Sequence, residues 1–161
     1  MAESNPYGND KKVTKLECIN HVAKRMGSRL RKLKMTQKGK KLDDNKTLAG
    51  KGRLTDSKIN QLQSYYSNAI KNNLDNTENM RRAVWATYYH LQGHHAFCPT
   101  DSNTWCKANH PDKVHNDSSN LPKAILDEIK PIYRDLSHPD LLKRCQHGGT
   151  QNPNESFNNT I

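Results

Sequence analysis

The stretch Lys15–Lys34, KLECINHVAKRMGSRLRKLK, indicates the fold class of this protein. Its apolar side chains recur at steps of three and four residues, which is the spacing of one face of an α-helix. These side chains belong to Leu16, Ile19, Val22, Ala23, Met26, Leu30 and Leu33. The sequence therefore predicts an amphipathic helix over residues 14–34.

The same spacing predicts three further helices and one short helical segment. Thr55 or Asp56 can cap the second helix, and Asn76 or Thr77 can start the third. The fourth begins near Leu121, and the short segment covers Pro139–Arg144. The apolar faces are Ile59, Leu62, Tyr66, Ala69 and Ile70; then Met80, Val84, Tyr88 and Leu91; then Ile125, Leu126, Ile129 and Ile132. Because no segment alternates apolar and polar residues, we expect a mainly α fold.

Residues 93–120 follow neither pattern and are rich in His, Asp, Asn and Ser. A connection of this length is unusual in a compact domain, so we expect something other than a hydrophobic core to order it. Metal binding is one possibility, because thiolate and imidazole groups gather in and just before this segment. The candidate donors are His90, His94, His95, Cys98, Cys106 and His110.

A second candidate metal site combines two short pairs of residues. Cys18 and His21 lie about one helical turn apart, so both can reach one ion. Cys145 and His147 could complete a tetrahedral Cys2His2 site if the fold brings the two pairs together. The four cysteines could instead form two disulfides in a secreted chain, but the polar start MAESNPYGND does not read as a secretory signal. Free thiols or metal ligands are therefore favoured.

The excess of basic over acidic residues lies in the first third of the sequence. The net charge is +10, and residues 1–58 hold 16 Lys/Arg against 6 Asp/Glu. Nine basic residues occur between Lys24 and Lys41 with no acid among them. Such a run forms either a solvated face or a polyanion-binding surface. The candidate nucleic-acid contacts are Lys24, Arg25, Arg29, Arg31, Lys32, Lys34, Lys51 and Arg53.

Length and composition limit the remaining possibilities. A chain of 161 residues is about one domain, and 32% apolar residues allow only a modest core. No run approaches the roughly 18 apolar residues of a membrane span. We expect an intracellular protein that does not enter a membrane.

Four stretches together resemble the Mutator-like transposase domain of mobile elements. They are KLECINHVAKRMGSRLRKLK, LAGKGRLTDSKINQLQSYYSNAIKNN, AFCPTDSNTWCK and RCQHGGTQNPNESFNNTI, and the likeness covers roughly Pro6 to Ile161. It implies an RNase H-like catalytic domain in which three acids hold two divalent ions, Mg²⁺ or Mn²⁺, for DNA strand cleavage and transfer. Glu155 falls on the position of the third acid. Cys18 and His21 fall on a CxxH motif near the start of a helical insertion, which raises the case for zinc.

The resemblance also implies a division of the chain. Residues 1–13 would be a linker after the catalytic core, 14–144 the helical insertion, and 145–161 the start of the last catalytic helix. The first two acids and the core strands are expected upstream of Met1, so the chain alone is expected to be inactive. DNA is the expected partner, in the nucleus and within a possible homo-oligomer. The alternative is a non-catalytic zinc- and DNA-binding helical module, or an inert remnant of a mobile element.

Overall fold

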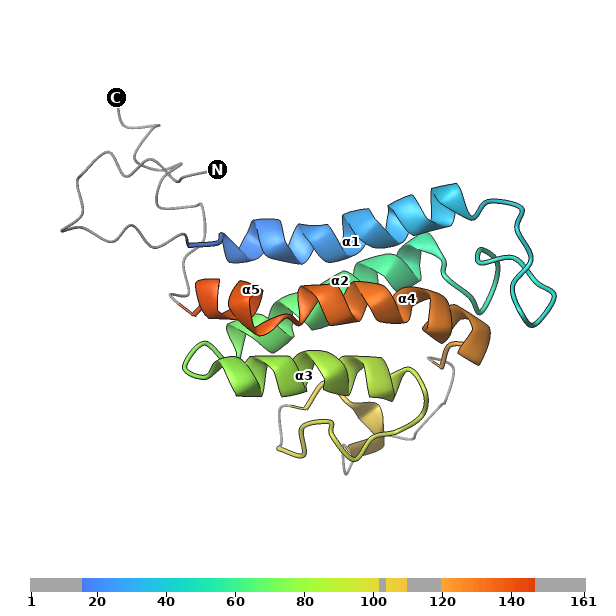
Figure 1. Ribbon diagram of the computed structural model, residues 1–161. Coiled ribbons are helices and arrows are strands. Elements are labelled where there is room, and N and C mark those ends of the chain that lie inside the picture. The colour runs from blue at the N-terminus through green and yellow to red at the C-terminus, as the bar shows by residue number, and fades with distance from the viewer. Residues whose placement is uncertain (1–15, 102–103, 110–119, 147–161) are drawn as a thin grey trace, which may run out of the picture.

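The computed structural model describes residues 16–101, 104–109 and 120–146, which form a helical bundle (Figure 1). Its elements are α1 (Ile19–Thr36), α2 (Asp56–Lys71), α3 (Thr77–His90), the short 3₁₀ helix η1 (Lys107–Asn109), α4 (Lys123–Leu136) and α5 (Pro139–Arg144). The described residues contain no strand, and an isolated antiparallel bridge joins Lys41 to Thr47. The predicted mainly α fold is confirmed.

The predicted helix starts agree closely with the observed ones, with one exception. Thr55 caps α2 by accepting a hydrogen bond from the Lys58 N–H, and Asn76 caps α3 in the same way. The first helix begins at Ile19 and not at residue 14, and Leu16 is 58% exposed. The backbone N–H of Glu17 donates instead to the carbonyl of Arg144, so this segment pairs with the end of α5.

The core lies where the apolar faces of the helices meet. α1 packs against α2 and α4, while α3 packs against α2, α4 and α5. α4 and α5 follow each other nearly end to end between α1 and α3 (Figure 1). Gly27 leaves room for the end of the Gln63 side chain from α2, which a Cβ atom at this position would displace. Apart from Leu16, the predicted inward residues of all four helices are buried or pack against the core.

The loop between α1 and α2 is held by a buried arginine. Arg53 is 7% exposed, and its guanidinium donates to both carboxylate oxygens of Asp44. Its Nε also donates to the Thr47 carbonyl at 2.6 Å. This pairing holds the pKa of Asp44 below its ordinary value, and the Lys46 N–H adds a second hydrogen bond to the carboxylate. Arg53 therefore organises the loop from within.

None of the helices in the described ranges combines the length and apolar character needed to cross a membrane. The division of the chain at residues 13 and 144 stays a prediction, since residues 1–15 and 147–161 lie outside the described residues.

Candidate metal centre and basic surface

The turn that ends α3 places two histidines side by side. Gly93, at φ +82°, donates to the His90 carbonyl, and the His94 N–H donates to the Tyr89 carbonyl. These two bonds form a Schellman motif, which reverses the chain with a left-handed glycine. The chain then returns over the end of α3, so the His95 ring lies 4.8 Å from the His90 ring.

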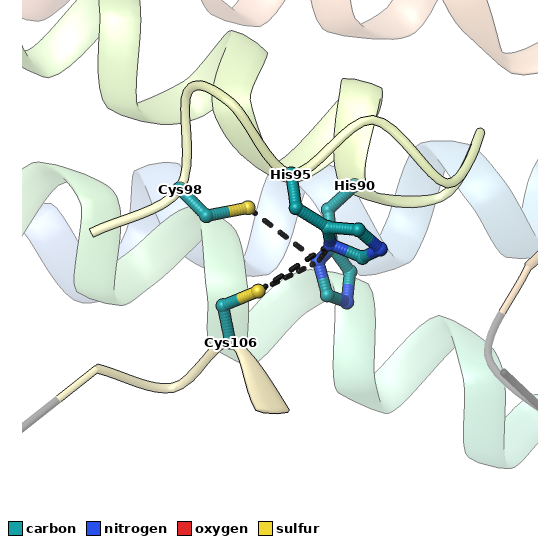
Figure 2. A group of neighbouring side chains, drawn as sticks. All are labelled: His90, His95, Cys98 and Cys106. Atoms are coloured by element: carbon teal, nitrogen blue, oxygen red, sulfur yellow. Dashed lines mark hydrogen bonds between the residues drawn. The ribbon is translucent and has the colours of Figure 1, made fainter. Parts of the chain in front are cut away.

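Four side chains converge at this turn. His90, at the end of α3, and His95 meet Cys98 and Cys106, whose sulfur atoms point at the two rings (Figure 2). The Nδ1 atoms of the histidines are 3.1 Å apart, and His90 Nδ1 lies 3.5 Å from Cys98 Sγ and 3.6 Å from Cys106 Sγ. Cys106 Sγ lies 3.4 Å from His95 Nδ1. All four ligand atoms lie within 4.8 Å of one another.

Hydrogen bonds from side chains to backbone groups hold the segment that carries these four side chains. The amide of Asn109, in η1, donates to the carbonyls of His95, Cys98 and Pro99. The Thr104 hydroxyl donates to the Pro99 carbonyl at 2.6 Å and accepts from the Cys106 N–H at 3.1 Å. The two cysteines are thus fixed from both sides by short polar side chains.

Aromatic rings and burial cover most of the cluster. The Trp105 ring lies 4.7 Å from the Tyr65 ring of α2 and 4.8 Å from the His90 ring. His90, Cys98 and Cys106 are buried. Burial raises the pKa of the Cys98 thiol to about 12, with the neighbouring Cys106 adding to the effect. Trp105 therefore packs between α2 and the His90 ring.

The structure selects four of the six candidate donors in this region. His94 is exposed and lies outside the group, although it is adjacent to His95. His110 lies outside the described residues. All four members of the group are among the six donors expected from the sequence, but the choice between His94 and His95 depends on the Schellman turn.

The second candidate site is only partly described. Cys18 precedes α1 and Cys145 follows α5, and both lie at the same end of the bundle, where the Glu17 backbone pairs with Arg144. Burial raises the pKa of Cys145 to about 11, and nearby Glu17 and Cys18 act in the same direction. His21 is exposed. His147 and Glu155 lie outside the described residues, so the four-ligand zinc site and the catalytic assignment stay predictions.

Four of the eight predicted nucleic-acid contacts take part in ion pairs. Arg25 pairs with Glu17 at 3.0 Å, Arg29 with Asp135 at 3.3 Å, and Lys34 with Asp56 at 3.0 Å. The fourth is the buried Arg53.

The other four cations, Lys24, Arg31, Lys32 and Lys51, are exposed. Arg31 donates to the neutral side chain of Asn60. Within the described ranges, none of the four has an acidic partner.

The exposed cations lie on the outer face of α1 and in the loop that follows it. Lys24, Arg31 and Lys32 recur at helical spacing opposite the buried face of Val22, Met26 and Leu30. Lys38, Lys40, Lys41 and Lys51 are exposed in the loop. The surface presents a row of charges that could follow a phosphate backbone.

The domain is thus a helical bundle with a cluster of thiol and imidazole groups at one turn and a cationic outer face. Comparison with known protein families shows which family it belongs to. The sequence model of the family described as Mutator, the Mutator-like transposases, matches residues 1–106, and the chain belongs to this family. The match includes α1 to α3 and all four residues of the His/Cys cluster. No curated protein and no solved structure matches the chain.

Proposed function

We propose that this chain is the DNA-contacting helical part of a DNA transposase, and that it binds duplex DNA without sequence preference through the outer face of α1 and the following loop. Membership in the Mutator-like transposase family makes DNA the expected partner. The observation that carries the proposal is the set of exposed cations without an acidic partner in the described ranges.

Six of the nine basic residues between Lys24 and Lys41 can contribute directly. Three are neutralised in ion pairs by Glu17, Asp135 and Asp56. The remaining six are Lys24, Arg31, Lys32, Lys38, Lys40 and Lys41. If each contacts one phosphate, the logarithm of the affinity should fall with the logarithm of salt concentration with a slope of about −5. A fourfold rise in salt should then weaken binding about 1,000-fold.

Two variants with equal net charge test this assignment. Changing Lys24, Arg31 and Lys32 to Gln removes three cations from the outer face of α1 that have no acidic partner among the described residues. Changing Arg25, Arg29 and Lys34 to Gln removes three cations of the same helix that already pair with acids.

Binding is measured by fluorescence anisotropy with labelled duplexes of unrelated sequence, over a range of salt concentrations. We expect the first variant to lower the salt slope by about 3 on every duplex. The second should leave the slope nearly unchanged. Equal losses in the two variants would show that only overall charge matters, and no loss in the first would refute the proposed surface.

In the full-length relative, we propose that Glu155 acts as the third acid of a two-metal site that uses Mg²⁺ or Mn²⁺. Two such ions, about 3.5–4 Å apart, stabilise the attacking and leaving oxygens of strand transfer. Two further acids would be needed to complete such a site. This proposal rests on the motif around Glu155 and on the family, and it includes a nuclear location and a possible homo-oligomer.

A further inference from the structure

We propose that His90, His95, Cys98 and Cys106 together bind one zinc ion, and that this ion fixes the segment between α3 and η1. The inference is independent of DNA binding. It also concerns a different place from the Cys18, His21, Cys145 and His147 set. It rests on the convergence of two imidazoles and two thiols at a single point (Figure 2).

The distances between the ligand atoms agree with a tetrahedral ion. Zn–N bonds of about 2.0–2.1 Å and Zn–S bonds of about 2.3 Å place neighbouring ligands about 3.3 Å apart for two nitrogens and about 3.6 Å for nitrogen and sulfur. The two Nδ1 atoms are 3.1 Å apart. The three recorded distances between sulfur and Nδ1 are 3.5, 3.6 and 3.4 Å. An ion fits at the centre with small adjustments.

Hydrogen bonding among the four groups explains their arrangement less well than a bound ion does. Buried polar side chains in proteins usually bond to backbone groups, whereas here all four ligand atoms turn toward one another. A neutral imidazole has one donor and one acceptor nitrogen, and a thiol is a weak donor. His90 Nδ1 has three partners within 3.6 Å, namely His95, Cys98 and Cys106, which suits a shared cation better than a single proton.

The donor set selects the kind of ion. Two sulfurs and two nitrogens in a tetrahedron favour zinc over oxygen-preferring ions such as Mg²⁺ and Ca²⁺. Four protein ligands close the coordination sphere and leave no position for a reacting water, so the site is structural and not hydrolytic.

The segment needs such an ion because it contributes little to the core. Between Gly93 and Asn109, the described residues that are buried are the two cysteines and Thr104. Phe97, the large apolar residue of the turn, is 66% exposed. An ion joining the end of α3 to Cys106 would replace the missing hydrophobic contacts. The Asn109 amide and the Thr104 hydroxyl then hold the ligand-bearing backbone in place.

The ion would also hold one wall of a cavity of about 940 Å³. The wall that the ion does not touch consists of side chains from α2, α3 and the turn between them, among them Trp85. The wall that the ion would hold consists of Phe97, Pro99, Asp101, Thr104 and Trp105, which all lie in or beside the metal-bound segment. Loss of the ion should therefore release Trp105 from Tyr65 and His90 and dismantle this wall.

The experiment uses the full chain, purified under reducing conditions and supplied with zinc, and measures metal content by mass spectrometry. The test variant changes Cys98 and Cys106 to Ser, and the matched control changes Cys18 and Cys145 to Ser. We expect the test variant to bind one zinc ion fewer than the unchanged chain. The control should retain the ion at His90 and His95 whether or not the other site binds a second one.

Cobalt substitution reports on the ligands even if a serine variant fails to fold. In the unchanged chain, Co²⁺ should give the visible absorption of a tetrahedral site with two sulfur ligands. His95→Cys keeps four zinc-compatible ligands but changes the set to three sulfurs and one nitrogen, so the bands should shift. Chelation of the metal should change Trp fluorescence, and readdition of zinc should restore it.

Three results would overturn the proposal. The first is a zinc content that is unchanged in the Cys98 and Cys106 variant. The second is a failure of the unsubstituted chain to take up zinc or cobalt. A disulfide between Cys98 and Cys106 in place of a metal site would count as this result. The third is a cobalt spectrum that does not respond to His95→Cys but disappears in the Cys18 and Cys145 control.

Discussion

Removal of the hydroxyl group from two buried tyrosines, Tyr66 and Tyr133, should change the free energy of unfolding differently. The Tyr66 hydroxyl, from α2, donates to the Leu136 carbonyl at 2.8 Å. Leu136 is the last residue of α4, where carbonyls have no partner within the helix. The Tyr133 hydroxyl is buried with no hydrogen-bond partner among the described residues. Burial raises the pKa of Tyr133 and nearby Thr87 lowers it slightly, but the Thr87 hydroxyl donates its hydrogen to the Val84 carbonyl, and no hydrogen bond joins Thr87 to Tyr133.

The magnitudes follow from what each change leaves behind. Tyr66→Phe keeps the ring but leaves a buried carbonyl unpaired, which costs about 1–3 kcal/mol in free energy of unfolding. Tyr133→Phe removes a buried polar group that has lost its water without gaining a partner. We expect it to be neutral or to stabilise the fold by up to about 2 kcal/mol.

Urea denaturation followed by circular dichroism measures both changes under the same metal conditions. Both side chains are fully buried, so the two variants remove the same group from the interior and differ in whether that group has a hydrogen-bond partner. For a chain of this size, each 1 kcal/mol corresponds to about 2–4 °C in melting temperature. Equal destabilisation by the two substitutions would refute the reasoning, since it would mean that the Tyr133 hydroxyl also has a partner.

Two further predictions concern acid stability and catalysis. The pKa of Asp44 is lowered in the folded protein, chiefly by the hydrogen bond from Arg53, so this carboxylate stabilises the fold above its unfolded pKa of about 3.9 and ceases to do so as the pH falls through its folded value. Asp44→Asn should therefore flatten the acid limb of the stability profile more than the exposed Asp43→Asn does, and equal profiles would contradict this. A version of the protein that cleaves supercoiled DNA with Mg²⁺ or Mn²⁺ should lose this activity in Glu155→Gln. A version that keeps cleaving after this change would disprove the role of Glu155.

The helices were predictable from sequence because the period of the apolar residues carries the information. Ile59, Leu62 and Tyr66 repeat at helical spacing and are all buried. The caps at Thr55 and Asn76 were predictable for a similar reason, since their side chains act within three residues. Leu16 fits the same apolar period but is exposed, because the backbone of Glu17 bonds to Arg144, a residue distant in sequence.

The cluster of His90, His95, Cys98 and Cys106 was predictable from sequence as a set of candidate ligands but not as one site. A local excess of His and Cys marks the segment, and its lack of apolar residues suggests that a core does not order it. Which imidazole points inward depends on the left-handed turn at Gly93. This turn brings His95 and not His94 back over His90. Sequence spacing alone does not distinguish these neighbours.

The cations show most clearly what a charge count leaves out. The nine basic residues from Lys24 to Lys41 would predict a salt slope of about −8 if all contacted phosphate. Asp135 lies 106 residues from Arg29 in the sequence, yet the two side chains form an ion pair in the fold. Glu17 and Asp56 neutralise two more cations of α1 in the same way. A measured slope near −5 would therefore support a surface in which paired cations stay with their acids. A slope near −8 would mean that DNA displaces those acids and that all nine cations contact phosphate.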